Sequence, residues 1–215
     1  MHRPEGNRAA FAAELKGYRH GTHRVVEPLR TQEALASKLA LLGVTRVADV
    51  TGLDYIGIPV MMSVRPLSRT LSVNQGKGLT REEARTSAIM ESVEYFCAER
   101  TQENLIRQPL DSFEPRQFVL PKRSLRRRLA PRTAIPWVPG RDLMSGRTVL
   151  VPEEVVRLDF SVPQPEHYGW FRSTSNGLAA GNTLAEASLH AICELVERDA
   201  FSLWLQAPAR RQAEG

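Results

Sequence analysis

The sequence has none of the features that mark a membrane or secreted protein. Its 215 residues contain no apolar run long enough to cross a bilayer, and its first residues lack the apolar core of a signal peptide. We therefore expect a cytoplasmic protein. The only two cysteines, Cys97 and Cys193, are too few for a disulfide framework or a cysteine metal site. Both fall in predicted helices, and we interpret them as buried thiols.

Aromatic residues are also scarce, at 7% of the chain, and none is interleaved with the main basic cluster at residues 122–132. The chain has a formal net charge of +5, and much of the excess lies in this cluster and near the N-terminus. A nucleic-acid patch and a solvated basic loop are both open interpretations. The second is favoured, because a platform for stacking bases needs aromatic rings among the charges. Nucleic acid is therefore not expected as a partner.

What remains is the composition of an ordinary globular domain, with 42% hydrophobic and 25% charged residues. Residues 1–22 are polar and weakly periodic, which predicts a disordered or flexible lead-in. Residues 23–205 carry the periodic patterns and are predicted to form one domain. Residues 206–215 are rich in Ala, Arg and Gln, which predicts a frayed tail.

Short apolar runs bounded by turn residues alternate with longer helical patterns in this domain. The pattern predicts an α+β fold, with a mostly antiparallel sheet packed by helices. The strands are expected over 44–50, 56–64 and 69–74, with a hairpin formed by 135–138 and 147–151. The helices are expected over 31–42, capped by Thr31, over 80–100, and from 182 to about 205. Residues 101–135 are predicted to connect these elements.

The last helix carries an acidic stripe. Thr183 and Glu186 have the spacing of a capping box at its start. At about 100° per residue, one side of the helix carries Glu186, His190, Glu194 and Glu197. The opposite side carries Leu184, Leu189, Ile192, Leu195 and Val196. No Lys or Arg balances the acidic side before Arg198, so we expect a cation there.

The helix over 80–100 repeats this arrangement. Thr80 and Glu83 form a second capping box, and Glu91 and Glu94 share a face with small residues. Glutamates three residues apart repel each other unless a cation lies between them. If the two helices faced each other, they would gather four carboxylates, which suits Mg²⁺ bound to substrate phosphates. The alternative is two solvated acidic faces, or ion pairs with Arg85 and Arg198.

Two further features have open interpretations. Residues 75–78, Gln-Gly-Lys-Gly, are predicted to form a tight turn, and Lys77 either binds a phosphate next to the following helix or is simply solvated. The P-loop spacing is absent. His190 lies on the acidic stripe, where it either belongs to the site or is structural. No Cys, His and Asn pattern indicates a thiol nucleophile.

Four separated motifs resemble those of the YcaO family, in the family's order. They are Ser-Val-Asn-Gln-Gly-Lys-Gly-Leu-Thr at 72–80, Ser-Ala-Ile-Met-Glu-Ser-Val-Glu at 87–94, Asn-Gly-Leu-Ala-Ala-Gly-Asn-Thr at 176–183, and Glu-Leu-Val-Glu-Arg at 194–198. The resemblance runs from about Arg24 to about Leu205. The segment over 43–60 most resembles the branch that works with TfuA proteins in making thioamides.

The resemblance implies an enzyme that uses ATP and Mg²⁺ to activate a backbone amide of a ribosomally made peptide or protein. In the family, the amide oxygen attacks the γ-phosphoryl group, a nucleophile adds to the activated carbon, and phosphate leaves. Sulfide gives a thioamide, and a neighbouring Cys, Ser or Thr gives an azoline. The implied partners are the substrate, a TfuA-type protein and a second copy of the chain in a homodimer.

The motif match assigns site residues by position. The metal-binding glutamates of the family fall at Glu91, Glu94, Glu194 and Glu197. The expected ATP-binding residues are Arg24, Thr31, Lys77, Glu186, His190 and Arg198. Tyr95 stands where the family often has Arg, and His190 stands where some members have Gln. No catalytic residue is assigned.

The family domain continues beyond the last motif, so the resemblance predicts an incomplete YcaO-type domain, the N-terminal portion. This leaves a second hypothesis, in which the chain is a catalytically incomplete fragment that binds a peptide or a partner. Mg²⁺-dependent binding of ATP distinguishes the two hypotheses.

Overall fold

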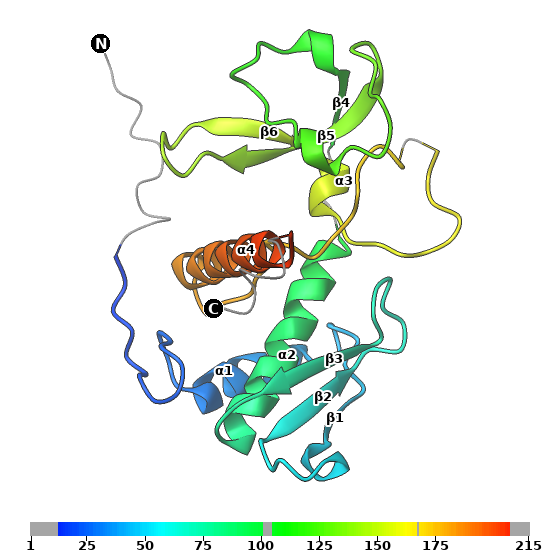
Figure 1. Cartoon of the computed structure of the whole chain (residues 1–215). Coiled ribbons are helices and arrows are strands. Elements are labelled where there is room, and N and C mark those ends of the chain that lie inside the picture. Colours follow the sequence, from blue (N-terminus) through cyan, green and yellow to red (C-terminus); the bar gives the residue numbers. More distant parts are fainter. Residues whose placement is uncertain (1–12, 101–104, 167, 207–215) are drawn as a thin grey trace. The chain divides into compact units, whose positions relative to one another are not determined.

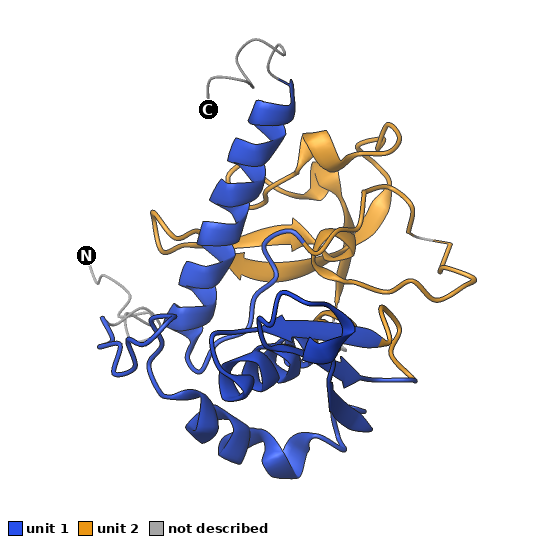
Figure 2. Cartoon of the chain, turned by 60° about the horizontal axis from the view of Figure 1, so that its bottom comes forward, with its two compact units in different colours: residues 1–66, 73–94, 176–215 blue, residues 67–72, 95–175 orange. Residues whose placement is uncertain are grey.

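The structure is a computed structural model that describes residues 13–100, 105–166 and 168–206 (Figure 1). The chain divides into two compact units (Figure 2). Unit 1 comprises residues 1–66, 73–94 and 176–215, and unit 2 comprises residues 67–72 and 95–175. The sequence had led us to expect one domain over 23–205. No helix within the described ranges is both long and apolar enough to span a membrane.

Unit 1 contains a three-stranded antiparallel sheet in the order β1-β2-β3. Its strands are β1 (Arg46–Asp49), β2 (Val60–Val64) and β3 (Val73–Lys77). Val47 is paired with Ser63, and Ser63 with Asn74, so alternate residues of the three strands share one face of the sheet. The predicted α+β class with antiparallel strands is confirmed.

Helix α2 (Arg81–Ala98) packs closely on this sheet. Ala84 and Ala88 are fully buried and form a core cluster with Met61. A Cβ on Gly76 would lie only 2.1 Å from the backbone N of Ala88. The small residues of the helix therefore face the sheet, and a glycine in β3 permits the close approach.

The structure of unit 1 and its surface corrects two predictions made from the sequence, one about β3 and one about the cysteines. The third strand was expected over 69–74 followed by a turn at 75–78, but β3 runs from Val73 to Lys77. The glycine at 76 serves the contact with α2 rather than a turn. The cysteines Cys97 and Cys193 are unpaired, but both are exposed rather than buried.

The first helix also begins earlier than expected. Helix α1 spans Pro28–Leu35 and continues into a 3₁₀ turn at Ala36–Lys38, whereas the prediction placed a helix over 31–42. Glu27 occupies the N-cap position and a proline lies in the first turn, where its missing N–H costs nothing. Thr31 is therefore not the cap but a buried residue inside the helix.

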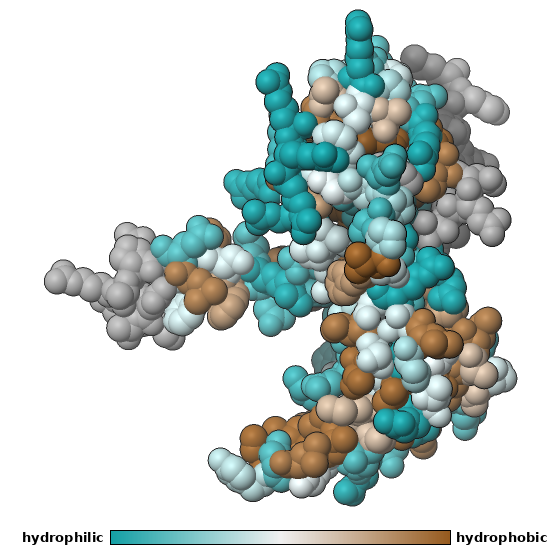
Figure 3. Space-filling model, turned by 90° about the vertical axis from the view of Figure 1, so that its right-hand side faces the viewer, coloured by the Kyte–Doolittle hydropathy of each residue, from teal (hydrophilic) through white to brown (hydrophobic). Residues whose placement is uncertain are grey.

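Helix α4 (Leu184–Gln206) begins as predicted, but its apolar stripe is not covered. Every residue from Leu195 to Gln206 is exposed, and Val196 retains 64% of its accessible surface. Figure 3 shows apolar residues on the surface at the end of this helix, at the left of the view.

Unit 2 contains a second antiparallel sheet in the order β4-β5-β6. Its strands are β4 (Ile106–Pro109), β5 (Ala134–Arg141) and β6 (Thr148–Pro152), followed by the short helix α3 (Glu153–Val156). The predicted hairpin is confirmed, with Val138 paired to Val151. Strand β4 was missed, because it lies in the polar stretch that was interpreted as a connection. Ile135, Trp137 and Phe171 form the buried core of the unit.

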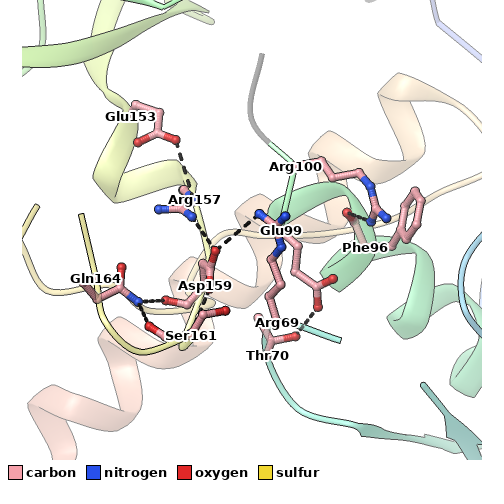
Figure 4. Close-up of polar contacts among 10 residues, drawn as sticks. All are labelled: Arg69, Thr70, Phe96, Glu99, Arg100, Glu153, Arg157, Asp159, Ser161 and Gln164. Atoms are coloured by element: carbon pink, nitrogen blue, oxygen red, sulfur yellow. Dashed lines mark hydrogen bonds and ion pairs between the residues drawn. The ribbon is translucent and has the colours of Figure 1, made fainter. Parts of the chain in front are cut away.

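A polar network ties residues 67–72 to the rest of unit 2 (Figure 4). Asp159 pairs with both Arg157 and Arg69, the latter at 3.6 Å. The hydroxyl of Thr70 donates to Glu99 over 2.6 Å, at the end of α2. These contacts explain why a short segment of early sequence belongs to the later unit.

The two predicted terminal segments lie only partly within the described residues. Residues 1–12 of the lead-in and 207–215 of the tail lie outside them. Residues 13–22 are described, and the main chains of Tyr18 and Arg24 form a two-bond bridge. Gln206 is the last residue of α4.

We predict that Gly76→Ala destabilises unit 1 severely. The new Cβ would meet backbone atoms of α2 at 2.1 and 2.2 Å, so helix and strand must separate. The expected loss is about 3 kcal/mol or more, measured as the free energy of unfolding in urea. Gly52→Ala is the matched control, since nothing lies within 4 Å of its added Cβ. Equal stability of the two variants would contradict the packing described here.

Candidate functional site

The two helices that carry paired glutamates begin in the same way. At the start of α2, the backbone N–H of Glu83 donates to the Thr80 hydroxyl, and the Glu83 carboxylate accepts from the N–H groups of Leu79 and Thr80. At the start of α4, the N–H of Glu186 donates to Thr183. Both predicted capping boxes are thus present.

Both capping carboxylates are buried. Glu83 and Glu186 keep only 8% and 6% of their accessible surface. Burial alone would raise the pKa of Glu83, but hydrogen bonds from Tyr18, Leu79 and Thr80 outweigh it and hold the pKa below its usual value. Glu83 is therefore a structural anion at neutral pH.

One short segment contacts both capping glutamates. The Tyr18 hydroxyl donates to Glu83 over 2.8 Å, and the N–H of Val25 donates to Glu186 over 2.8 Å. Arg24 adds an ion pair with Glu186 at 3.5 Å. Because Tyr18 and Arg24 are bridged to each other through their main chains, this segment connects the N-termini of α2 and α4.

Helix α1 reinforces the same connection. The hydroxyl of Thr31 donates to Oδ1 of Asn182 over 2.8 Å, next to the start of α4. The Gln32 amide donates to Thr86 over 2.9 Å and to the Glu82 carbonyl over 3.0 Å, both on α2. Tyr18 and Asn182 were not predicted as site residues, because nothing in the local pattern around them indicates contacts so distant in sequence.

Beyond their first turns, the two helices bring carboxylates into one another's field. Burial is the main reason that the pKa of Glu94 is raised to about 7, and the charges of Glu194 and Glu91 add to it. Burial also raises the pKa of Glu91, opposed by the backbone of Gln75 and the charge of Lys77. Three of the four predicted metal ligands therefore interact electrostatically.

The remaining predicted site residues divide between open and buried surroundings, and Thr31 and Glu186 are the buried ones. Glu197, His190 and Lys77 are exposed. Arg198 forms an ion pair with Glu194 at 2.7 Å, which is the alternative that the sequence left open for this glutamate. Near the start of α4, Arg24 forms its ion pair with Glu186, which also accepts the N–H of Val25. Thr31 donates to Asn182 there.

The four glutamates do not form a closed ligand shell. Within the described part of the chain, no three His, Cys, Asp or Glu side chains lie close enough to hold one metal ion. The metal set therefore stays a prediction. Its chemistry nevertheless fits Mg²⁺, because the donors are hard carboxylate oxygens. The pKa of Glu94 is raised chiefly by burial, and the nearby charges of Glu194 and Glu91 raise it further, which a bound cation would offset.

Comparison with protein families gives a match over residues 75–214. The matching family is described as YcaO cyclodehydratase, ATP- and Mg²⁺-binding. The matched range contains the end of β3 and all of α2 and α4, and with them all four predicted metal-binding glutamates.

Similar sequences occur in bacteria and archaea. An uncharacterised protein in the tfuA 3′ region of Rhizobium leguminosarum is 42% identical over 192 residues, which are 87% of this chain and 45% of that protein. An uncharacterised protein of Methanothermobacter thermautotrophicus is 36% identical over 187 residues, 84% of this chain and 47% of that protein. The chain thus spans less than half the length of these relatives.

Two solved structures resemble the fold. The YcaO protein of Methanopyrus kandleri bound with AMPPCP and Mg²⁺ is 30% identical, with a TM-score of 0.67 over 87% of this chain and 47% of that one. A heterocyclase in complex with substrate and cofactor is 23% identical, with a TM-score of 0.68 over 91% of this chain and 30% of that one. The second match is informative about the fold alone.

We predict that Glu94 makes stability depend on pH when no divalent cation is present. Its folded pKa of about 7 lies above the usual 4.5, so between these values the folded state holds more protons than the unfolded state. Stability should therefore fall as the pH rises from about 4.5 to about 7. Urea denaturation at several pH values measures the free energy of unfolding. In the Glu94→Gln variant this free energy should decrease less between these pH values.

The matched control for this prediction is Glu82→Gln. Glu82 lies on the same helix but is exposed. The charges that raise the pKa of Glu94 are those of Glu194 and Glu91, not that of Glu82. This variant should retain the pH dependence of the unmodified chain. An equally steep fall in the Glu94→Gln variant would contradict the assignment.

Proposed function

This chain belongs to the YcaO family, and we propose that it takes part in the ATP- and Mg²⁺-dependent activation of a backbone amide in a peptide or protein. The observation that carries the proposal is the interaction of Glu91, Glu94 and Glu194, from two helices, which contributes to the high pKa of Glu94. The family's description as ATP- and Mg²⁺-binding supports it, as does the similarity to a structure holding AMPPCP and Mg²⁺.

In this proposal the carboxylates of α2 and α4 hold Mg²⁺. Glu91, Glu94, Glu194 and Glu197 supply oxygen ligands, and Mg²⁺ commonly bridges such carboxylates and phosphate oxygens. Glu94 changes role with its protonation, since a proton at pH below about 7 competes with the metal for the same oxygens. Metal affinity should accordingly rise with pH.

The proposed cationic and polar contacts come from the other predicted residues. Arg198 and Lys77 are the cations assigned to the nucleotide phosphates. Arg198 would exchange its ion pair with Glu194 for a phosphate contact, since Glu194 would hold the metal ion instead. Arg24, Thr31, Glu186 and His190 complete the proposed nucleotide-binding set.

Bound ATP would supply the phosphoryl group that converts the amide oxygen into a leaving group. This chain's part is positioning and charge neutralisation, which are the main demands of phosphoryl transfer. A nucleophile then forms a bond to the amide carbon, and the carbon–oxygen bond breaks as phosphate departs with the former amide oxygen.

We favour sulfide as the nucleophile, which gives a thioamide rather than an azoline. The Rhizobium relative lies in a tfuA region, and residues 43–60 resemble the branch that works with TfuA proteins. A TfuA-type protein is the proposed partner.

The second candidate function is binding without turnover. Arg24 and Glu186 are paired with each other and Thr31 is bonded to Asn182, so these three side chains hold the fold together. The chain also spans less than half the length of its relatives. In this alternative the chain binds a peptide or partner, because side chains engaged in holding the fold are not available to a nucleotide.

We predict that Glu94→Gln lowers the affinity for AMPPCP in the presence of Mg²⁺ at least about tenfold, because a metal ligand is lost. The same substitution should leave stability at pH 8 unchanged or raise it, since a half-buried carboxylate is removed. Isothermal titration of the chain with AMPPCP, with and without Mg²⁺, measures the first effect, and urea denaturation measures the second.

Glu82→Gln again serves as the control and should bind AMPPCP like the unmodified chain. Unchanged Mg²⁺-dependent affinity in Glu94→Gln would contradict the metal assignment. If the unmodified chain binds no AMPPCP with Mg²⁺, the binding function without turnover is favoured.

We further predict that the product is a thioamide, which mass spectrometry can detect. A library of short peptides incubated with the chain, ATP, Mg²⁺ and sulfide should gain the mass difference between sulfur and oxygen. Loss of water from peptides that contain Cys, Ser or Thr, independent of sulfide, would instead indicate azoline formation.

A further inference from the structure

The net positive charge of the chain lies entirely in unit 2. Unit 2 contains fourteen Lys and Arg residues against nine Asp and Glu, a balance of +5. Unit 1 contains fifteen of each, a balance of zero. Residues 115–133 of unit 2 include seven Lys and Arg and no acidic residue. This segregation of charge calls for a physical role, because like charges repel within a folded unit.

The centre of this basic stretch is folded onto the core rather than looped into solvent. The backbone N–H of Arg126 donates to the Trp170 carbonyl over 2.8 Å, and the backbone N–H of Arg172 donates to the Ser124 carbonyl over 2.7 Å. Leu125 is bridged to Phe171, which is buried, and both Leu125 and Leu129 pack against the unit 2 core. The solvated basic loop inferred from the sequence is present, and these contacts hold it against the core; we call it the ridge.

In the ridge, leucines pack inward on the core and the basic side chains between them point to solvent. Its members are Lys122, Arg123, Arg126, Arg127 and Arg128, and all five side chains are exposed. Within the described residues, none of the five forms an ion pair with a carboxylate, whereas Arg132 pairs with Asp111 and Arg157 with Asp159. The ridge thus presents cations that are not neutralised inside unit 2.

One arginine of the ridge also covers its nearest aromatic ring. The guanidinium carbon of Arg127 lies 3.7 Å from the centre of the Trp170 ring, and the group donates to the Tyr168 carbonyl over 3.4 Å. A ring that is capped in this way does not offer a free face to a nucleic-acid base. A planar guanidinium held in place does suit a carboxylate, which accepts two parallel hydrogen bonds from it.

We propose that this ridge is a docking surface for an acidic polypeptide segment. The arginines meet its Glu and Asp side chains, and the order of the ridge reduces the entropy lost when the complex forms. The proposal is independent of ATP binding, because it involves no residue of the predicted metal or nucleotide set.

Fluorescence anisotropy of the full chain tests the proposal with a short labelled peptide in which Glu alternates with Ala. The peptide should bind, and its affinity should fall as salt rises towards 0.15 M, where the Debye length is about 8 Å. The triple variant Arg123→Glu, Arg126→Glu and Arg128→Glu should weaken binding at least about tenfold, since three attractive contacts of a few tenths to 1 kcal/mol each become repulsive.

The matched control is the triple variant Arg19→Glu, Lys38→Glu and Arg46→Glu. It changes the net charge equally, but its exposed side chains lie in unit 1. It should bind the peptide within about twofold of the unmodified chain, so that net charge alone is excluded as the cause. Circular dichroism melting of both triple variants establishes that they are folded.

Two results would overturn the proposal. One is equal loss of peptide binding in both triple variants, which would mean a diffuse charge effect. The other is tighter, ridge-dependent binding of oligo-dT or a DNA duplex than of the acidic peptide at the same salt, which would make the ridge a nucleic-acid surface. A Lys-Ala peptide should not bind.

Discussion

Two buried glutamates at helix N-termini determine the arrangement of unit 1. Glu83 and Glu186 each accept backbone N–H groups from residues just before their own helix, and each also accepts from the segment that contains Tyr18 and Val25. A buried carboxylate is tolerated only when its hydrogen bonds are satisfied. The segment therefore cannot move away from either helix without leaving a charge unpaired, and α2 and α4 are fixed together at their starts.

This arrangement explains the environment of the proposed metal ligands. With both helices held at their N-termini, and α2 held against the sheet at Gly76, Glu94 lies within the fields of Glu91 and Glu194. The burial that raises its pKa is a cost to stability above that pKa. Perturbed pKa values of this kind cluster at functional sites.

The two units divide the chemistry between them. Unit 1 carries the paired glutamates and has no net charge, while unit 2 carries the whole excess of +5 and exposes it on an ordered ridge. The first suits a cation with phosphates, and the second suits an anionic partner. The proposed modification of a polypeptide would use both kinds of surface, one for the chemistry and one for recognition of the chain to be modified.

The sequence by itself determined the features that depend on neighbouring residues: the two capping boxes, the hairpin across the turn at residues 140–146, the α+β class and the four family motifs. Those features need only local spacing. Tertiary structure decided the rest. Only the approach of α2 explains Gly76 as a strand residue, and only contacts across 161 positions join Val25 to Glu186. Pairings so distant have no local signal, since they depend on which faces meet when the chain packs.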